Sequence, residues 1–314
     1  MICRFALSIA MAMGLAVCGA AQGQSNSEIY ARACREAVGP IPEFSCADGV
    51  SVPVTVDGAP VSAPKPGMDC DRPALLNNGE GSDGQCVPNS RILSLSTTRL
   101  QAAVMCRQKR IRSADSMEFD EIDVIAHNPA TGATCWFQAG GPSGLVNGAR
   151  APSPTGATGG GYWRAPEAVA QEGCGRCHDS GPFMFSPFVG QVWRVMPSDP
   201  FGPYYHVDPA SFGFAVWPTE QLAPRDNACL GCHRIGTGET CRSLTQWMTG
   251  RAIPEAADAW ARRYPGSHAM PPGLDVTQAT WANVYAQAVD ELLSCCRKPD
   301  QAACNREKAE KRAD

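Results

Sequence analysis

The sequence Cys174-Gly175-Arg176-Cys177-His178 has a counterpart in Cys229-Leu230-Gly231-Cys232-His233, so the pentad CxxCH occurs twice in the second half of the chain. Each pentad places two thiols three positions apart and an imidazole directly after the second thiol. The four cysteines could bind zinc, but the two pairs lie further apart than zinc-site pairs usually do, and zinc needs no histidine after each pair. A disulfide within each pair is a third interpretation.

Covalent haem attachment explains every residue of the pentad. Two thiols add to the two vinyl groups of one porphyrin, and the histidine that follows supplies the proximal imidazole to the iron. Chance would give roughly 0.01 such pentads in a chain of this composition, so two are not a coincidence. We therefore predict two covalently bound c-type haems with these attachment and iron-binding residues: Cys174, Cys177, Cys229 and Cys232 for the porphyrins, His178 and His233 for the irons.

The sixth ligand of the first iron is predicted from the aromatic stretch between Phe183 and Trp217. Wide, rigid side chains are suited to the apolar face of a haem. His206 lies within this stretch and is our first choice, because the chain has only five histidines. Met184 and Met196 are alternatives, and an open or water-bound iron is another.

For the second iron we predict Met270, which precedes Pro271 and Pro272 and a helix expected over Thr277–Ser294. His268 is the rival ligand, and neither residue is the remaining alternative. From 229 to 294 the chain resembles class I cytochromes c, in which a Met-Pro loop supplies the thioether and an aromatic-bearing helix closes on the haem. With its two CxxCH pentads, the chain as a whole resembles dihaem c-type cytochromes. The usual helix before CxxCH is missing, and Cys241 suggests an additional disulfide.

The first 21 residues have the layout of a secretory signal peptide, with Arg4, the apolar run Phe5–Val17 and small residues up to Ala21. Ten of the sixteen cysteines lie outside this leader and the pentads. They predict disulfides and an oxidising compartment, periplasmic or secreted in a bacterium. We expect three bonds, mostly between sequence neighbours, among the first six cysteines and two among the last four. Adjacent Cys295 and Cys296 should bond to different partners. The ten are Cys34, Cys46, Cys70, Cys86, Cys106, Cys135, Cys241, Cys295, Cys296 and Cys304.

The predicted fold class is α+β, with a disulfide-rich, partly β region at 22–148 and a mainly helical dihaem cytochrome c region at 162–314. Residues 149–161 form either a linker or an ordered surface loop. The first region should hold a helix capped by Ser25 or Ser27, an edge strand over Val50–Val56 and a hairpin around Asn128–Gly132. Helices are expected at Pro166–Cys177, Ser243–Thr249, Pro254–Arg263 and Thr277–Ser294.

The formal net charge of −4 argues against nucleic acid as a partner, and no segment after the leader predicts stable membrane insertion. We expect an electron carrier with redox protein partners rather than a catalyst. The alternatives are a peroxidase- or oxidase-like dihaem enzyme with one open iron, and the cytochrome subunit of a larger redox complex. In the last case the first region would dock a partner. Four basic residues form either a docking patch there or, as we favour, a solvated charged face: Arg107, Lys109, Arg110 and Arg112.

Overall fold

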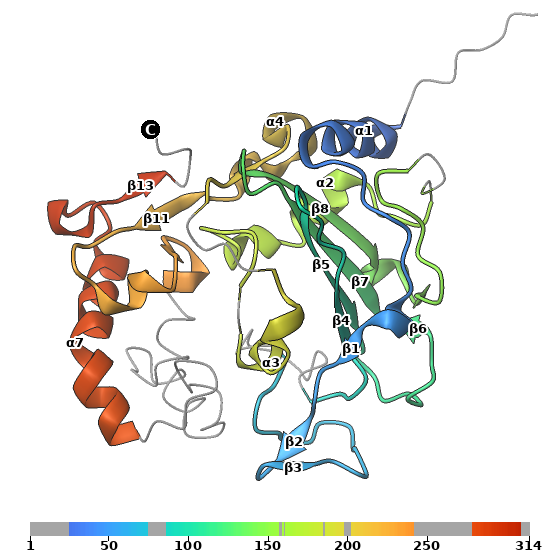
Figure 1. The fold of residues 1–314 in the computed structure, drawn as a ribbon, viewed down its shortest axis with the longest axis horizontal. Helices are drawn as coiled ribbons and strands as arrows, with labels where there is room; N and C mark the ends of the chain where they lie inside the picture. Colours follow the sequence, from blue (N-terminus) through green and yellow to red (C-terminus); the bar gives the residue numbers. More distant parts are fainter. Residues whose placement is uncertain are drawn as a thin grey trace, which may run out of the picture.

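The computed structural model describes residues 25–74, 86–156, 159, 161–184, 186–197, 202–241 and 278–308. A six-stranded sheet with the order β1-β4-β5-β7-β8-β10 forms its centre (Figure 1). Its neighbouring strands are antiparallel, except that β10 runs parallel to β8. The strands are β1 (Val50–Ser51), β4 (Arg91–Ser94), β5 (Gln101–Arg107), β7 (Glu121–His127), β8 (Ala133–Gly140) and β10 (Tyr205–His206).

Helix α1 (Asn26–Val38) packs on one face of this sheet. The Ser25 hydroxyl accepts the Glu28 N–H while the Glu28 carboxylate accepts the Ser25 N–H, so both groups of a capping box are satisfied. Its buried residues Tyr30, Cys34 and Val38 recur every four positions and face the sheet. The capped helix predicted from the sequence is confirmed.

The hairpin of β7 and β8 is also confirmed, with Asn128–Gly132 as its turn. Every residue of β8 is buried because both faces of this strand are covered. The predicted Val50–Val56 strand is divided at Pro53 into β1, at the edge of the sheet, and β2 (Thr55–Val56). Proline has no N–H for a ladder, which explains the break. The remaining short strands of this half are β3 (Ala59–Pro60), β6 (Glu118–Phe119) and β9 (Val146–Asn147).

The predicted fold class is wrong in its helical part. Between residues 162 and 241 the described chain forms short helices, 3-10 turns and strands, and β10 joins the large sheet. Each short helix starts at a proline and soon stops; the helix predicted over Pro166–Cys177 ends at Gln171, before Gly173 turns the backbone to a φ of 74°. These helices are α2 (Pro166–Gln171), α3 (Pro187–Gly190) and α4 (Pro209–Phe212).

A smaller lobe is built from a three-stranded sheet and the long helix α7 (Gln278–Arg297). Helix α7 confirms the helix predicted over Thr277–Ser294 and extends three residues beyond it. The helices predicted at Ser243–Thr249 and Pro254–Arg263 lie outside the described residues. The sheet has the order β12-β11-β13, formed by β11 (Glu220–Leu222), β12 (Ile235–Gly236) and β13 (Glu307–Lys308).

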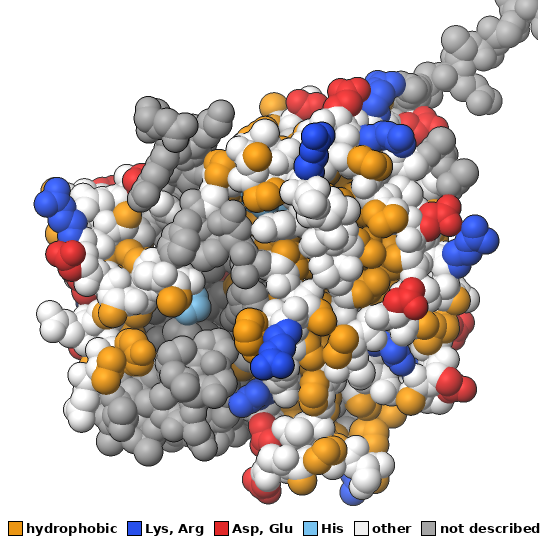
Figure 2. Space-filling view, in the orientation of Figure 1, with side chains coloured by type: hydrophobic (Ala, Val, Ile, Leu, Met, Phe, Trp, Pro, Cys, Tyr) orange, Lys and Arg blue, Asp and Glu red, His pale blue; other side chains and the backbone are white. Residues whose placement is uncertain are grey.

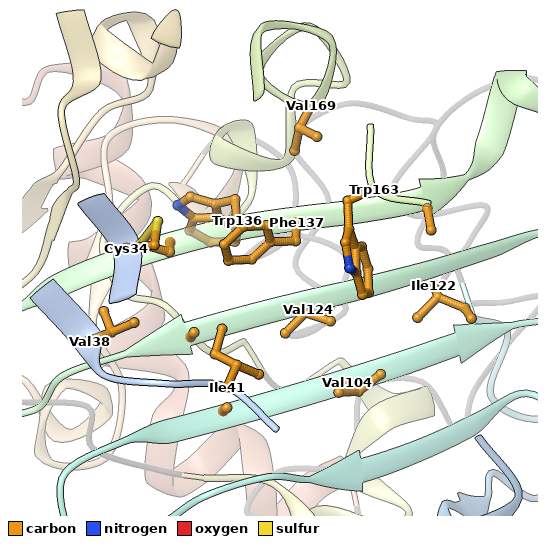
Figure 3. Close-up of a cluster of buried hydrophobic side chains, with 14 of the residues drawn as sticks. Cys34, Val38, Ile41, Val104, Ile122, Val124, Trp136, Phe137, Trp163 and Val169 are labelled. Carbon is orange, nitrogen blue, oxygen red and sulfur yellow. A yellow bond between two sulfur atoms is a disulfide. The ribbon is translucent and has the colours of Figure 1, made fainter. Parts of the chain in front are cut away.

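One hydrophobic core extends across the predicted boundary between the two regions (Figure 3). Trp163 and Val169 pack with Val38 and Val124 of the first region. The loop between the regions is anchored as well: Ala151 pairs with Phe44, and the Ser153 hydroxyl donates to the Ile41 carbonyl. These contacts hold Ala151 and Ser153 against the first region.

Five disulfides are present, and none joins the first six cysteines to the last four, as predicted. Cys295 and Cys296 do bond to different partners. The expectation of sequence neighbours is correct for Cys70–Cys86 but wrong for Cys34 and Cys46, because α1 and the loop after it cross the sheet to reach β8 and β5. The bonds are Cys34–Cys135, Cys46–Cys106, Cys70–Cys86, Cys241–Cys296 and Cys295–Cys304.

Candidate haem-attachment site

The disulfides separate the cysteines into two classes. All ten described cysteines outside the pentads are bonded, and the four free ones are the pentad thiols: Cys174, Cys177, Cys229 and Cys232. Burial raises the pKa of Cys174 to about 12 and that of Cys177 to about 11. A thiol that exchanges disulfides needs a lowered pKa, so the first pentad does not resemble a dithiol redox centre.

Both pentads adopt the same backbone turn. In the first, the Cys174 carbonyl accepts the N–H of Cys177 at 3.1 Å and that of His178 at 2.9 Å. In the second, the Cys229 carbonyl accepts the N–H of Cys232 at 3.2 Å and that of His233 at 2.9 Å. The two segments lie in different lobes, yet each presents two thiols and an imidazole from one tight turn.

The imidazole of His178 is held in the tautomer that a metal ligand requires. Its Nδ1 lies 2.9 Å from the carbonyl oxygen of Pro182, and because a carbonyl can only accept, Nδ1 carries the proton. Nε2 therefore keeps its lone pair, and burial lowers the histidine's pKa to about 4, so the ring is neutral. Liganding histidines characteristically donate their second N–H in this way. The residue thus fits an iron-bound role.

The first pentad packs against aromatic side chains of the large sheet and of the segments beside it. Cys135 of β8 is bonded to α1, so its neighbour Trp136 points to the opposite side of the strand, where its ring centroid lies 5.1 Å from that of His178. The ring of Trp217 lies directly over Gly175, where a Cβ would come within 2.2 Å of it. The Tyr204 hydroxyl donates to the His178 carbonyl at 2.7 Å.

His206 lies on β10 within this aromatic group and is 3 % exposed. Its Nδ1 accepts the indole N–H of Trp136 at 3.1 Å, so the proton of the neutral ring is on Nε2. Burial and the neighbouring His178 lower the pKa of His206 to about 4, while a hydrogen bond to the Trp217 backbone acts in the opposite direction.

The second pentad is supported by α7. The Asn227 side chain accepts the Cys229 N–H at 3.1 Å and donates to the Ala288 carbonyl at 2.8 Å and to Glu291 at 2.7 Å. Cys229 packs against Val289 of the same helix. His233 is half-buried, and burial lowers its pKa.

The other predicted ligands are placed differently. Met196 packs in the cluster around Phe188, and it lines a groove of about 730 Å³ beside the edge of β4. Met184 is half-buried. Met270 and His268 lie outside the described residues. Sequence reasoning did not identify Trp136 or Pro182 as neighbours of His178; Pro182, four positions later, is the only one close enough in sequence to be found.

Comparison with known proteins yields no match: no family model, no curated protein and no solved structure is similar to this chain. Within the described ranges, no group of three or more His, Cys, Asp and Glu side chains could hold a metal ion. Together with the sheet-rich fold, these findings show that the predicted identification with dihaem c-type cytochromes, and the class I cytochrome c resemblance of 229–294, are wrong. The pentads lie in a sheet-rich fold, not in the helical fold of a cytochrome c.

Proposed function

We propose that this chain is an electron carrier that holds two haems covalently, one at each pentad. The observation that carries the proposal is the separation of the cysteines, in which ten form disulfides while the four pentad thiols stay free. In an oxidising compartment, two thiols three positions apart would otherwise be expected to bond to each other or to a neighbour. Their retention in identical turns, each followed by a histidine, supports a use as attachment groups.

The attachment chemistry is local and independent of the fold around it. Each thiol S–H adds across one vinyl C=C bond to give a thioether, and no group leaves. The porphyrin itself supplies four nitrogens to the iron, so the protein needs to bring one imidazole and no cluster of three side chains. His178 and His233 would take this role, and a bound haem would supply one-electron redox chemistry. Met270 and His206 remain our predicted sixth ligands.

A second candidate function, a small-molecule reaction at an open first iron, is favoured by one hydrogen bond. The Trp136 indole donates to Nδ1 of His206, so Nε2 carries a proton and offers no lone pair to a metal. His206 can act as the sixth ligand only if this hydrogen bond is given up. Carbon monoxide added to the reduced protein separates the two functions, because binding requires an open or labile position.

The disulfides support a proposal for the compartment of the protein. Five disulfides indicate an oxidising environment, and none of the described helices is long and apolar enough to cross a membrane. We propose a bacterial periplasmic location after cleavage of the leader, and a redox protein as partner. The basic residues considered as a docking patch are largely neutralised, because Arg107 and Lys109 pair with Glu121 and Arg112 pairs with Asp120. Acidic and basic side chains are likewise interspersed in Figure 2.

Covalent attachment predicts a mass gain of two haems per secreted chain when the haem-attachment machinery is co-expressed. The haems should remain bound through acid–organic extraction and denaturing electrophoresis, because thioethers are not broken by either. Cys177→Ala and Cys232→Ala should each leave one site held by a single bond, while Met196→Leu, which removes no attachment thiol, should keep two haems. A full-length secreted chain without haem under these conditions would refute the proposal.

The ligand of the second iron is tested by Met270→Ala. A thioether stabilises ferrous iron more than a second imidazole does, so its loss should lower the potential of this haem and create carbon monoxide binding. His268→Ala is the matched control and should change neither. If His268→Ala alters the ligand spectrum and Met270→Ala does not, His268 is the sixth ligand. The second iron then has two histidine ligands.

A further inference from the structure

The segments that directly follow the two pentads are bonded to each other. Asp179, next to His178, is fully buried, and its carboxylate accepts the Gly238 N–H at 2.7 Å and the Thr240 hydroxyl at 2.6 Å. Gly236 lies so close that a Cβ there would come within 2.2 Å of the Asp179 carboxyl carbon. The segment after the second histidine therefore wraps around this side chain.

A second pair of residues joins the same segments reciprocally. The Arg234 guanidinium, next to His233, donates to the Ser180 carbonyl at 3.0 Å, and the Ser180 hydroxyl donates to the Arg234 carbonyl at 3.2 Å. A further N–H of Arg234 donates to the Gly202 carbonyl. We call Asp179, Ser180, Arg234, Gly238 and Thr240 the inter-pentad clamp.

The clamp is short and stiff compared with the chain that separates the pentads. Every member of the clamp lies within seven positions of a pentad histidine. The polypeptide between the two pentads, in contrast, includes the whole aromatic stretch from Phe183 to Trp217. A buried carboxylate that loses its donors is strongly destabilised, so the segments are held in one arrangement. Hydrogen bonds in such a low-dielectric setting are also stronger than at the surface.

We propose that the inter-pentad clamp fixes the separation and orientation of the two attachment sites, with Asp179 and Arg234 as positioning residues for electron transfer between the haems. This inference rests on the proposed function. Neither residue contacts a porphyrin in the proposal; each acts through the histidine beside it. Fixed geometry matters here because two redox groups exchange electrons at a rate set by their distance and mutual orientation.

The test compares Asp179→Ala and Thr240→Val with Arg176→Gln in the full chain. The Arg176–Glu239 ion pair spans the same two segments, but the Arg176 side chain is 73 % exposed, so this control removes a link that contributes little. We expect two haems per chain in all variants. Pulsed EPR between the two ferric irons should show a distance distribution roughly twofold broader in the clamp variants than in the parent and the control.

A second measurement does not depend on haem. Amide exchange at Gly238 should be about tenfold faster in Asp179→Ala and Thr240→Val, and unchanged in Arg176→Gln. If the unsubstituted protein carries no haem, the proposed function is wrong. The amide exchange rate at Gly238 then still tests the hydrogen bonds of the inter-pentad clamp. If haem is bound and the iron–iron distribution stays unchanged in both clamp variants, the inference is wrong. Thr240→Val preserves the shape of the side chain. It therefore tests the inference even if Asp179→Ala does not fold.

Discussion

Gly175→Ala is expected to lower the free energy of unfolding by about 3 kcal/mol, the upper part of the range for an overpacked core. A Cβ at this position would lie 2.2 Å from Cγ of Trp217. The indole cannot move aside easily, because its N–H donates to the Ala170 carbonyl at 3.0 Å and its ring packs edge-on against Trp136 and Phe214. The chain must therefore shift the first pentad itself, and haem content at that site should fall.

The matched control lies in the other pentad. A Cβ at Gly231 would meet no heavy atom within 4 Å in the described part of the chain, so Gly231→Ala should change the free energy by no more than about 0.5 kcal/mol. Urea unfolding with haem quantification measures both effects. Trp217→Leu in the Gly175→Ala background should relieve the clash, giving a cost smaller than the sum of the single variants. A purely additive result would show that the indole is not the obstacle.

Removing the Cys34–Cys135 disulfide should cost more stability than removing any shorter link. Its 101-residue separation corresponds to about 4.7 kcal/mol of loop-closure entropy in the unfolded chain, against about 3 kcal/mol for Cys70–Cys86 with a separation of 16. Cys34 and Cys135 are both 0 % exposed and lie between α1 and β8 in the core of Figure 3, so the alanine pair also leaves a cavity.

The comparison uses two double-alanine variants, one for each bond, unfolded in guanidinium chloride under oxidising conditions. We expect the Cys34/Cys135 variant to have the lower midpoint. Equal losses in the two variants would mean that neither loop length nor burial determines the contribution of these bonds, contrary to the chain-entropy account.

The elements that local sequence determines were predicted well. The Ser25–Glu28 capping box, the hairpin around Asn128–Gly132 and the separation of the disulfides into two sets all depend on residues close in sequence or on simple counting. The contact of Trp136 with His178 and the pairing of β10 with β8 could not be predicted, because they join distant segments. The helical cytochrome expectation failed because CxxCH specifies a five-residue chemistry and carries no information about the surrounding fold.

The nested pairing of Cys34 with Cys135 and of Cys46 with Cys106 has a consequence for how the chain matures. A secreted polypeptide emerges from its translocation channel N-terminus first, so Cys34 and Cys46 arrive well before Cys106 and Cys135, their partners in the native protein. An oxidant that joins thiols in order of arrival would link Cys34 to Cys46. That bond must later be opened by a thiolate and exchanged through a mixed disulfide, on a timescale of seconds to hours. With such an oxidant, the yield of native protein would depend on disulfide isomerisation as well as on oxidation.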